Sequence, residues 1–284
     1  MTSIAPPNLG GLMALPNSPE KAEFIKTFNA IARHKHRYSV FSDFVIMSAI
    51  SLHNAVNKID SLEKEYLEII NQYSEAEKKE FPKLFACLVG LLEPKPVDVL
   101  GALYMELELG NKNTGQFFTP SPISEMMAQI NYDTELQELD KPFVTLSEPA
   151  CGAGGMVLAF ANVMISYKHN PAEKLWVQCI DIDRVAALMC YLQLSLWNIP
   201  AQVIVGNTLS LEFREQYFTP AHYVYGWDTK LRWKKVMDYA VTIEKAPLKK
   251  QSALKKDEDN KLKENTKPQV KRRISTDVGQ LDMF

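Results

Sequence analysis

A glycine-rich stretch, residues 148–155 (EPACGAGG), most constrains what this chain can fold into. It follows the run 143–147, which predicts a buried strand, and precedes the apolar run 156–161, which predicts a helix. Three of its last four residues are glycine, which lets a ligand approach the backbone closely and adopts positive φ without strain. A strand, a glycine turn and a helix in this order present backbone N–H groups to a ligand. Taken alone, the pattern fits an ordinary turn equally well.

Two further predicted strands also end in polar residues. Residues 175–183 predict a strand with Asp181 and Asp183 on alternate positions, hence on one face. Asp181 has the position at which a ribose diol is bound in nucleotide-binding folds, at the end of the second strand. A predicted helix at 185–197 leads to a third strand at 201–205. The pattern predicts an α/β fold with a ligand site where the parallel strands end.

Composition divides the chain into four predicted parts. Ahead of the sheet, apolar residues recur at three- and four-residue spacing and predict several helices. The polar loop 111–122 holds two adjacent phenylalanines, which either fill an interface or flank a flat ligand. The four parts are a flexible N-terminus at 1–19, a helical domain at 20–110, a ligand-binding α/β domain at 111–244 and a disordered, lysine-rich tail at 245–284.

Charge and cysteine usage exclude several classes of protein. The net charge of −2 gives no overall attraction to nucleic acid, so any contact with DNA requires a local patch. The four cysteines form no C-x-x-C pair, so we expect neither a zinc site nor a disulfide framework. We find no leader sequence and no run long and apolar enough to span a bilayer, and therefore expect a cytoplasmic protein without metal or membrane partners.

Four stretches, in this order, resemble the S-adenosylmethionine motifs of adenine-N6 DNA methyltransferases. They are 114–120 (TGQFFTP), 148–155, 180–183 (IDID) and 206–209 (GNTL). The resemblance is to the modification subunits of type I restriction systems and their relatives, and it covers roughly residues 20–210. It implies a helical N-terminal domain followed by a truncated, Rossmann-like, S-adenosylmethionine-dependent methyltransferase domain. It also implies DNA as the substrate, a separate specificity subunit, and a bacterial, plasmid or phage context.

The same resemblance assigns a role to individual residues. Those implied to line the cofactor site are Gln116, Phe117, Phe118, Thr119, Glu148, Ala150, Gly152, Gly154, Asp181, Ile182 and Asn207. Thr119 and the loop before it would touch the methionine end of the cofactor. Asp181 would bind the ribose hydroxyls, and Ile182 would lie against the adenine. Asn207 stands where the family usually has an acid that binds the adenine amino group.

The catalytic tetrapeptide of the family is missing. In that family an Asn or Asp, two prolines and an aromatic hold the flipped adenine. Nothing after Leu209 has this pattern, and the nearest stretch, 217–223, offers Pro220, His222 and Tyr223 as candidate catalytic residues. Two hypotheses stay open: an adenine-N6 methyltransferase of reduced size, and a relative without chemistry that acts as a DNA- or clamp-associated binding or decoy protein. A dehydrogenase fits less well, because the turn is not G-x-G-x-x-G.

The last five residues form a second recognisable peptide. Gln280, Leu281, Asp282, Met283 and Phe284 resemble the peptide by which bacterial replication and repair proteins dock on the DNA sliding clamp. A position at the end of a flexible tail suits a tethering peptide. The similar stretch 193–197 lies inside a predicted core helix, so we interpret it as packing.

Overall fold

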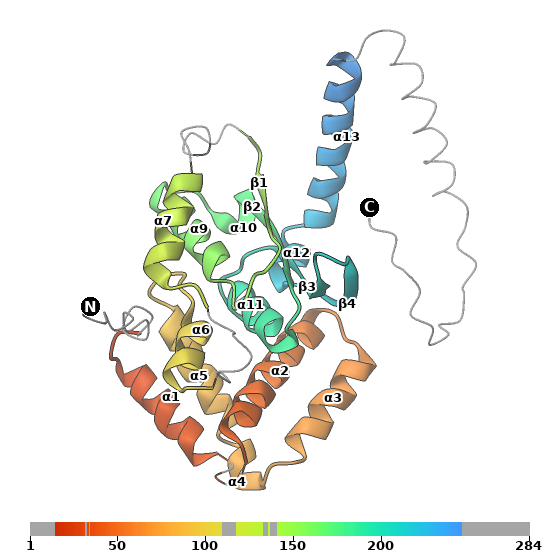
Figure 1. The fold of residues 1–284 in the computed structure, drawn as a ribbon. Coiled ribbons are helices and arrows are strands. Elements are labelled where there is room, and N and C mark those ends of the chain that lie inside the picture. Colours follow the sequence, from red (N-terminus) through yellow and green to blue (C-terminus); the bar gives the residue numbers. More distant parts are fainter. Residues whose placement is uncertain are drawn as a thin grey trace, which may run out of the picture. The chain divides into compact units, whose positions relative to one another are not determined.

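The computed structural model describes residues 15–31, 33, 35–109, 118–132, 136 and 141–245, with side chains up to residue 239. The chain divides into two compact units, Met1–Asp228 and Thr229–Phe284. The first unit holds the sheet and the helices up to α12 (Pro220–Val224) (Figure 1). Helix α13 (Trp227–Lys245) begins in the first unit and continues into the second. The sequence 280–284, with its clamp-like peptide, lies outside the described residues.

The N-terminal part is helical, as the spacing of its apolar residues predicted. Its helices are α1 (Pro19–Ala30), α2 (Arg37–Val56), α3 (Asp60–Ile70), α4 (Glu75–Lys78), α5 (Phe81–Leu92) and α6 (Val99–Glu106). At the starts of α1 and α6, a capping side chain accepts a hydrogen bond from a backbone N–H group. The Ser18 hydroxyl accepts from the Lys21 N–H at the start of α1, and Asp98 accepts from the Gly101 N–H at the start of α6. Buried phenylalanines join α1 to α2, with the Phe24 and Phe44 rings edge to face.

Helix α2 corrects the expectation that no segment is apolar enough to span a bilayer. By length and composition alone it passes that test, with a mean hydropathy of 1.3. Its apolar side chains, however, pack in the protein: Phe41, Phe44 and Val45 are each buried. The same composition therefore serves a helix at the centre of the helical part.

Four strands form one sheet in the order β1-β2-β3-β4. They are β1 (Val144–Glu148), β2 (Leu175–Asp181), β3 (Ala201–Asn207) and β4 (Glu212–Phe218). The first three are parallel, as expected, while β4 is antiparallel to β3 and was not predicted. Helix α7 (Ser121–Asn131) precedes β1, and α9 (Gly155–Ser166), α10 (Pro171–Lys174) and α11 (Arg184–Leu196) lie between the strands in sequence. The chain thus has the predicted α/β fold.

The first strand is not buried in the way its sequence suggested. Within the described residues β1 forms one edge of the sheet, and its side chains alternate between partly buried and exposed. Thr145 and Ser147 occupy the exposed positions. The alternation of polar residues, rather than a continuous apolar run, is the pattern of a strand that is covered on one face only.

Helix α11 joins the sheet to the helical part. It packs against β2, β3 and α2, and these four elements adjoin one another in Figure 1. Arg184, its first residue, donates to both carboxylate oxygens of Glu65 on α3 at 2.7 and 2.9 Å. The same guanidinium donates to both oxygens of Glu215 on β4 at 2.9 and 2.8 Å. One arginine thereby connects three elements that are distant in sequence.

Candidate functional site: a cofactor loop at the strand ends

The glycine turn lies directly behind the end of β1, and hydrogen bonds to β2 fix its conformation. The Cys151 N–H donates to the Ile180 carbonyl at 2.9 Å, and the Gly152 N–H donates to Asp181 Oδ2 at 2.7 Å. Gly152 and Gly154 have φ values of 52° and 92°, the left-handed region in which a side chain is strained. The two glycines therefore allow a turn that places backbone atoms next to the carboxylate of Asp181.

Two carboxylates flank this turn. Glu148, the last residue of β1, accepts from the Ala150 N–H with its Oε1 at 3.2 Å and so contacts the loop from the strand end, where it was predicted. Asp181, at the last position of β2, uses its second oxygen to accept from the Asp183 N–H at 2.9 Å. Burial raises the pKa of Glu148 and of Asp181 above their ordinary values. Partial burial of acids at the open end of a sheet is typical of groups that meet a ligand.

Asp183 has a different role from the one its sequence position suggested. The strand ends at Asp181, and Asp183 is the N-cap of α11, where its Oδ1 accepts from the Ala186 N–H at 2.8 Å. The exposed side chain of Ile182 lies between the two acids. Arg214 of β4 donates to the Ile182 carbonyl at 2.5 Å and so fixes this segment. Only Asp181 of the two acids is left to face a ligand at the strand end.

The end of β3 is tied to the loop that follows β1. The Thr208 hydroxyl donates to the Pro149 carbonyl at 2.7 Å, which joins the first and third strand ends. Asn207 Oδ1 accepts from the Leu209 N–H at 2.9 Å, so this side chain shapes its own turn. The structure thus brings Glu148, Asp181 and Asn207 to the same edge of the sheet, where the sequence predicted a site.

Phe118 packs between the helical part and the loop. It is buried, its ring meets Tyr104 of α6 edge to face, and it lies against Gly152. A Cβ at Gly152 would lie 3.1 Å from Phe118 Cδ1. Thr119, which is exposed, follows Phe118 in the segment that leads into α7. Gln116 and Phe117, the other predicted residues of this loop, lie outside the described residues.

A buried polar network behind the loop escaped the sequence analysis. Asp98 Oδ1 accepts from Gln193 Nε2 at 3.0 Å, and the same nitrogen donates to the Ala153 carbonyl at 2.8 Å. Gln193 Oε1 accepts from the Val99 and Leu100 N–H groups. Gln193 is fully buried in α11, so the interpretation of its segment as core is confirmed, but it also bonds α6 to the loop. An Asp just ahead of an apolar helical run was the available signal.

Three cysteines from separate elements meet beneath the loop. The sulphur atoms of Cys151, Cys179 and Cys190 all lie within 4.8 Å of one another, and all three residues are buried. A Cβ at Gly154 would lie 3.0 Å from Cys190 Sγ, so the cluster packs tightly against the turn. Hydrogen bonds to Cys179 and burial raise the pKa of Cys151, and the Asp181 carboxylate raises it further. The cluster was not predicted, because no C-x-x-C pair marks it in the sequence.

The candidate catalytic residues lie at the other end of the sheet. Because β4 is antiparallel, its last residue Phe218 pairs with Gln202 near the start of β3. The five residue-to-residue steps from Gln202 to Asn207 span about 17 Å along the strand. Pro220, His222 and Tyr223 follow in α12, so the structure does not bring them together with the cofactor residues.

His222 has a structural environment. It is buried, its Nδ1 accepts from Trp176 Nε1 at 3.1 Å and its Nε2 lies 3.2 Å from Asp228 Oδ1. Its ring packs against Phe218 with centroids 4.5 Å apart. Burial lowers the pKa of the imidazole. These contacts are those of a histidine packed in the protein interior.

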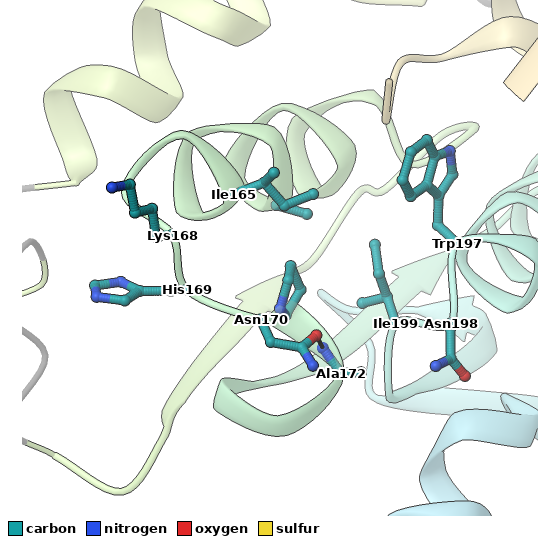
Figure 2. Close-up of a pocket in the computed structure, with 10 residues that line it drawn as sticks. Ile165, Lys168, His169, Asn170, Ala172, Trp197, Asn198 and Ile199 are labelled. Carbon is teal, nitrogen blue, oxygen red and sulfur yellow. Dashed lines mark hydrogen bonds between the residues drawn. The ribbon is translucent and has the colours of Figure 1, made fainter. Parts of the chain in front are cut away.

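A cavity of about 380 Å³ lies away from the glycine loop. It is lined by the end of α9, by α10 and by the turn between α11 and β3 (Figure 2). Ile165, Trp197 and Ile199 supply its apolar wall. Two of its polar side chains have partners in the protein: His169 Nδ1 lies 2.5 Å from the Tyr132 hydroxyl, and Asn198 donates to Tyr225. The buried Trp197 Nε1 has no hydrogen-bond partner among the described residues. It lies beside the first residues of β3, not at the strand ends that carry the site.

Comparison with known proteins gives one family and a general structural likeness. The family model described as N-6 DNA Methylase matches residues 98–273. A search of curated proteins found no match. A protein assigned as a class I S-adenosylmethionine-dependent methyltransferase from Listeria monocytogenes has 12% identity, a TM-score of 0.34, and coverage of 62% of this chain and 55% of its own. The methyltransferase subunit of a type I restriction-modification system from Streptococcus thermophilus has 17% identity, a TM-score of 0.30, and coverage of 58% and 38%. The chain therefore spans about half or less of the length of these two structures.

The residues present fit S-adenosylmethionine. Two glycines in left-handed conformation leave the face of the loop free of side chains, and Asp181 can accept from a hydroxyl with the lone pairs that its two loop hydrogen bonds leave. The first turn of α9 leaves N–H groups without intrahelical acceptors, which suits a carboxylate. A nucleoside with an attached amino acid offers both a ribose hydroxyl for Asp181 and a carboxylate for the start of α9.

Proposed function

Because the chain belongs to the N-6 DNA methylase family, we propose that it binds S-adenosylmethionine at the ends of β1, β2 and β3 and acts at DNA. The observation that supports this most is the hydrogen bond between the Gly152 N–H and Asp181 Oδ2. It joins the two motifs that a nucleoside cofactor must contact together, the glycine turn and the acid at the end of the second strand. The proposed setting is the cytoplasm, with a separate subunit that supplies DNA recognition.

Each residue of the site has a part in binding. When bound, S-adenosylmethionine supplies an electrophilic methyl group. Asp181 accepts from the ribose hydroxyls, and Ile182 offers an exposed apolar side chain to the adenine. Gly152 and Gly154 leave room for the ligand beside the backbone, and Thr119 lies at the methionine end. Because Asn207 already accepts from the Leu209 N–H, its amide nitrogen would face the adenine.

Beyond cofactor binding, the proposal has two forms, which differ in whether the methyl group is transferred. The first is transfer of the methyl group to the N6 amine of adenine in DNA, the reaction of the family. The second is binding without transfer, as a DNA-associated or decoy protein. One observation favours the second for the isolated chain: Pro220, His222 and Tyr223 lie about 17 Å along β3 from the cofactor end. We therefore expect very slow or no methylation without a partner that completes the base pocket.

Two measurements test this proposal. Calorimetry with S-adenosylhomocysteine should give saturable heat, and Asp181→Ala should weaken binding by about 1–3 kcal/mol because a hydrogen bond to the ribose is lost. Transfer of a labelled methyl group to mixed DNA should then be followed with and without bacterial partner proteins. A folded protein that binds neither cofactor nor product would contradict the proposal. Rapid transfer by the chain alone would instead select the first function.

The C-terminal peptide suggests a route to DNA. We propose that residues 280–284 dock on the sliding clamp, with Leu281 and Phe284 in an apolar groove and Gln280 hydrogen-bonded at its edge. Asp282 and Met283 lie between these anchors. Tethering raises the local concentration of the chain at DNA, which offsets its lack of net positive charge. Deleting 280–284 should abolish co-elution with the clamp and leave cofactor binding intact. Equal clamp association by both forms would rule the tether out.

A further inference from the structure

A small cavity adjoins the glycine loop on the side of the helical part. Its volume is about 10 Å³, enough for a single group the size of a water molecule. It lies where the starts of α6, α7 and α9 meet. Asp98, Thr119, Ser124 and Gly155 contribute to its wall. Two of its polar residues, Asp98 and Ser124, are buried, so a polar occupant would find partners there.

The two oxygens of Asp98 differ in their partners. Oδ1 accepts both from the Gly101 N–H at 2.7 Å and from Gln193 Nε2 at 3.0 Å. Oδ2 receives no hydrogen bond from the described residues and faces Gly155: a Cβ built there would lie 3.5 Å from it. Asp98 is 5% exposed, and none of the ion pairs among the described residues includes it. One oxygen of a buried carboxyl is therefore available to a ligand.

Ser124 provides a second, independent polar group at the same place. It is 2% exposed, and its Oγ has no hydrogen-bond partner among the described residues. The Cβ built on Gly155 would lie 3.8 Å from this oxygen, so Gly155 faces both Ser124 and Asp98. A side chain at position 155 would fill the space that they share. Buried polar atoms left without partners in a native structure indicate an occupant.

We propose that Asp98 Oδ2 and Ser124 Oγ bind the α-ammonium group of the methionine part of S-adenosylmethionine. The inference rests on the proposed cofactor site, since Thr119, the residue at the methionine end, lines the same cavity. An ammonium group matches the cavity in size, carries the charge opposite to that of a carboxylate and has three donors for the two acceptors. The neighbouring N–H groups at the start of α9 suit the carboxylate of the same amino acid.

Burial of Asp98 is consistent with a site that is completed by a cation. Burial raises the pKa of this carboxyl, and its hydrogen bonds from Gln193 and Gly101 oppose that change only in part. An uncompensated acid in a core is costly for a fold, whereas the same acid beside a bound ammonium group is stabilised. The competing account is a single buried water that bridges the two oxygens.

The variant Asp98→Asn separates these accounts. The asparagine keeps Oδ1 for Gly101 and Gln193 and replaces only Oδ2 with an NH₂ group, so the start of α6 keeps its cap. Ser124→Ala removes the second acceptor. Asp181→Ala serves as the comparison, because it acts at the ribose. Thermal unfolding of each variant shows that it is folded before affinities are compared.

Two ligands complete the experiment. S-adenosylhomocysteine carries the ammonium group, while 5′-methylthioadenosine has the same nucleoside and sulphur without the amino acid. Asp98→Asn should weaken S-adenosylhomocysteine about ten- to hundredfold and leave 5′-methylthioadenosine unchanged, and Ser124→Ala should do the same to a smaller extent. Asp181→Ala should weaken both ligands.

Three results would overturn the inference. If Asp98→Asn weakens both ligands equally, Asp98 has only a structural role. If it weakens neither, the cavity holds a water. If the folded wild-type protein binds neither ligand, the proposed cofactor site itself fails, and this inference fails with it. The two ligands thus distinguish failure at the methionine end from failure of the whole site.

Discussion

Replacing Gly152 by alanine tests the loop, and Gly226 provides a matched control. Both glycines have left-handed backbones, with φ of 52° and 63°. An alanine in this region costs about 1 kcal/mol relative to glycine at either position. The surroundings differ, because a Cβ at Gly226 meets nothing within 4 Å, whereas at Gly152 it lies 3.1 and 3.3 Å from two ring carbons of Phe118. The pair therefore separates backbone strain from contact with the ring.

Gly152→Ala should lose stability for both reasons. Overpacking against a buried ring adds about 1–3 kcal/mol to the backbone term, because Phe118 is wedged against Tyr104. A loss of 1 kcal/mol lowers the melting temperature of a unit of this size by about 2–4 °C. Scanning calorimetry should thus show about 2–4 °C for Gly226→Ala and about twice that or more for Gly152→Ala.

Cofactor affinity is the second quantity to measure in the same two variants. Gly152→Ala places a methyl group and a displaced Phe118 at the loop, so binding of S-adenosylhomocysteine should fall at least about tenfold, the equivalent of 1.4 kcal/mol. Gly226 lies at the end of α12, so its alanine variant should bind like the wild type. Equal melting shifts for the two variants, or unchanged affinity in Gly152→Ala, would refute the assignment of Gly152 to the ligand face.

Three further outcomes follow from side chains outside the loop. Arg184→Met should lower the free energy of unfolding by about 2 kcal/mol in urea titrations, because it leaves Glu65 and Glu215 without their partner, while Lys26→Met at the exposed pair with Glu23 should change nothing measurable. Burial lowers the pKa of His53 and His222, so the unfolded chain binds protons first as pH falls below about 6.5; stability should decline in that window, and less so in His222→Gln. In the native protein a thiol reagent should react with Cys151, Cys179 and Cys190 no faster than with the partly buried Cys87, whereas all four cysteines should react in guanidinium. Rapid reaction of the three clustered thiols in the native protein would contradict their burial.

Features with a local cause were predictable from the sequence. The glycine turn and the acid after the second strand follow from residue types at fixed spacing, and both lie where they were expected. Asp183, however, was wrongly placed in the second strand. The strand ends at Asp181, and Asp183 is the N-cap of α11, a role that an acid just after a strand can also have. The first strand was expected to be buried, although Thr145 and Ser147 already alternated in the way of a strand with one covered face.

Features that depend on distant partners were not predictable. The role of Asp98 depends on Gln193 in another helix, and the cysteine cluster joins a loop, a strand and a helix. β4 was not predicted, because Glu212, Arg214 and Gln216 alternate with a set of residues that includes the charged Glu215, so neither period nor apolarity marks a strand. Its antiparallel direction then moved the candidate catalytic residues to the far end of the sheet, which no spacing in the sequence could reveal.

The two faces of the sheet differ in polarity. Parallel sheets are usually covered on both faces and have continuous apolar strands. Here the side chains of Gln178, Gln202 and Gln216 form a row across β2, β3 and β4, with amide hydrogen bonds of 3.2 and 3.1 Å between neighbours. The opposite face carries the buried Val177 and Val203. The glutamine amides satisfy one another's hydrogen-bonding groups across the strands and tolerate water. The described sheet therefore needs helices on one face only. The alternation of polar and apolar residues in these strands therefore matches a sheet that is covered on one face.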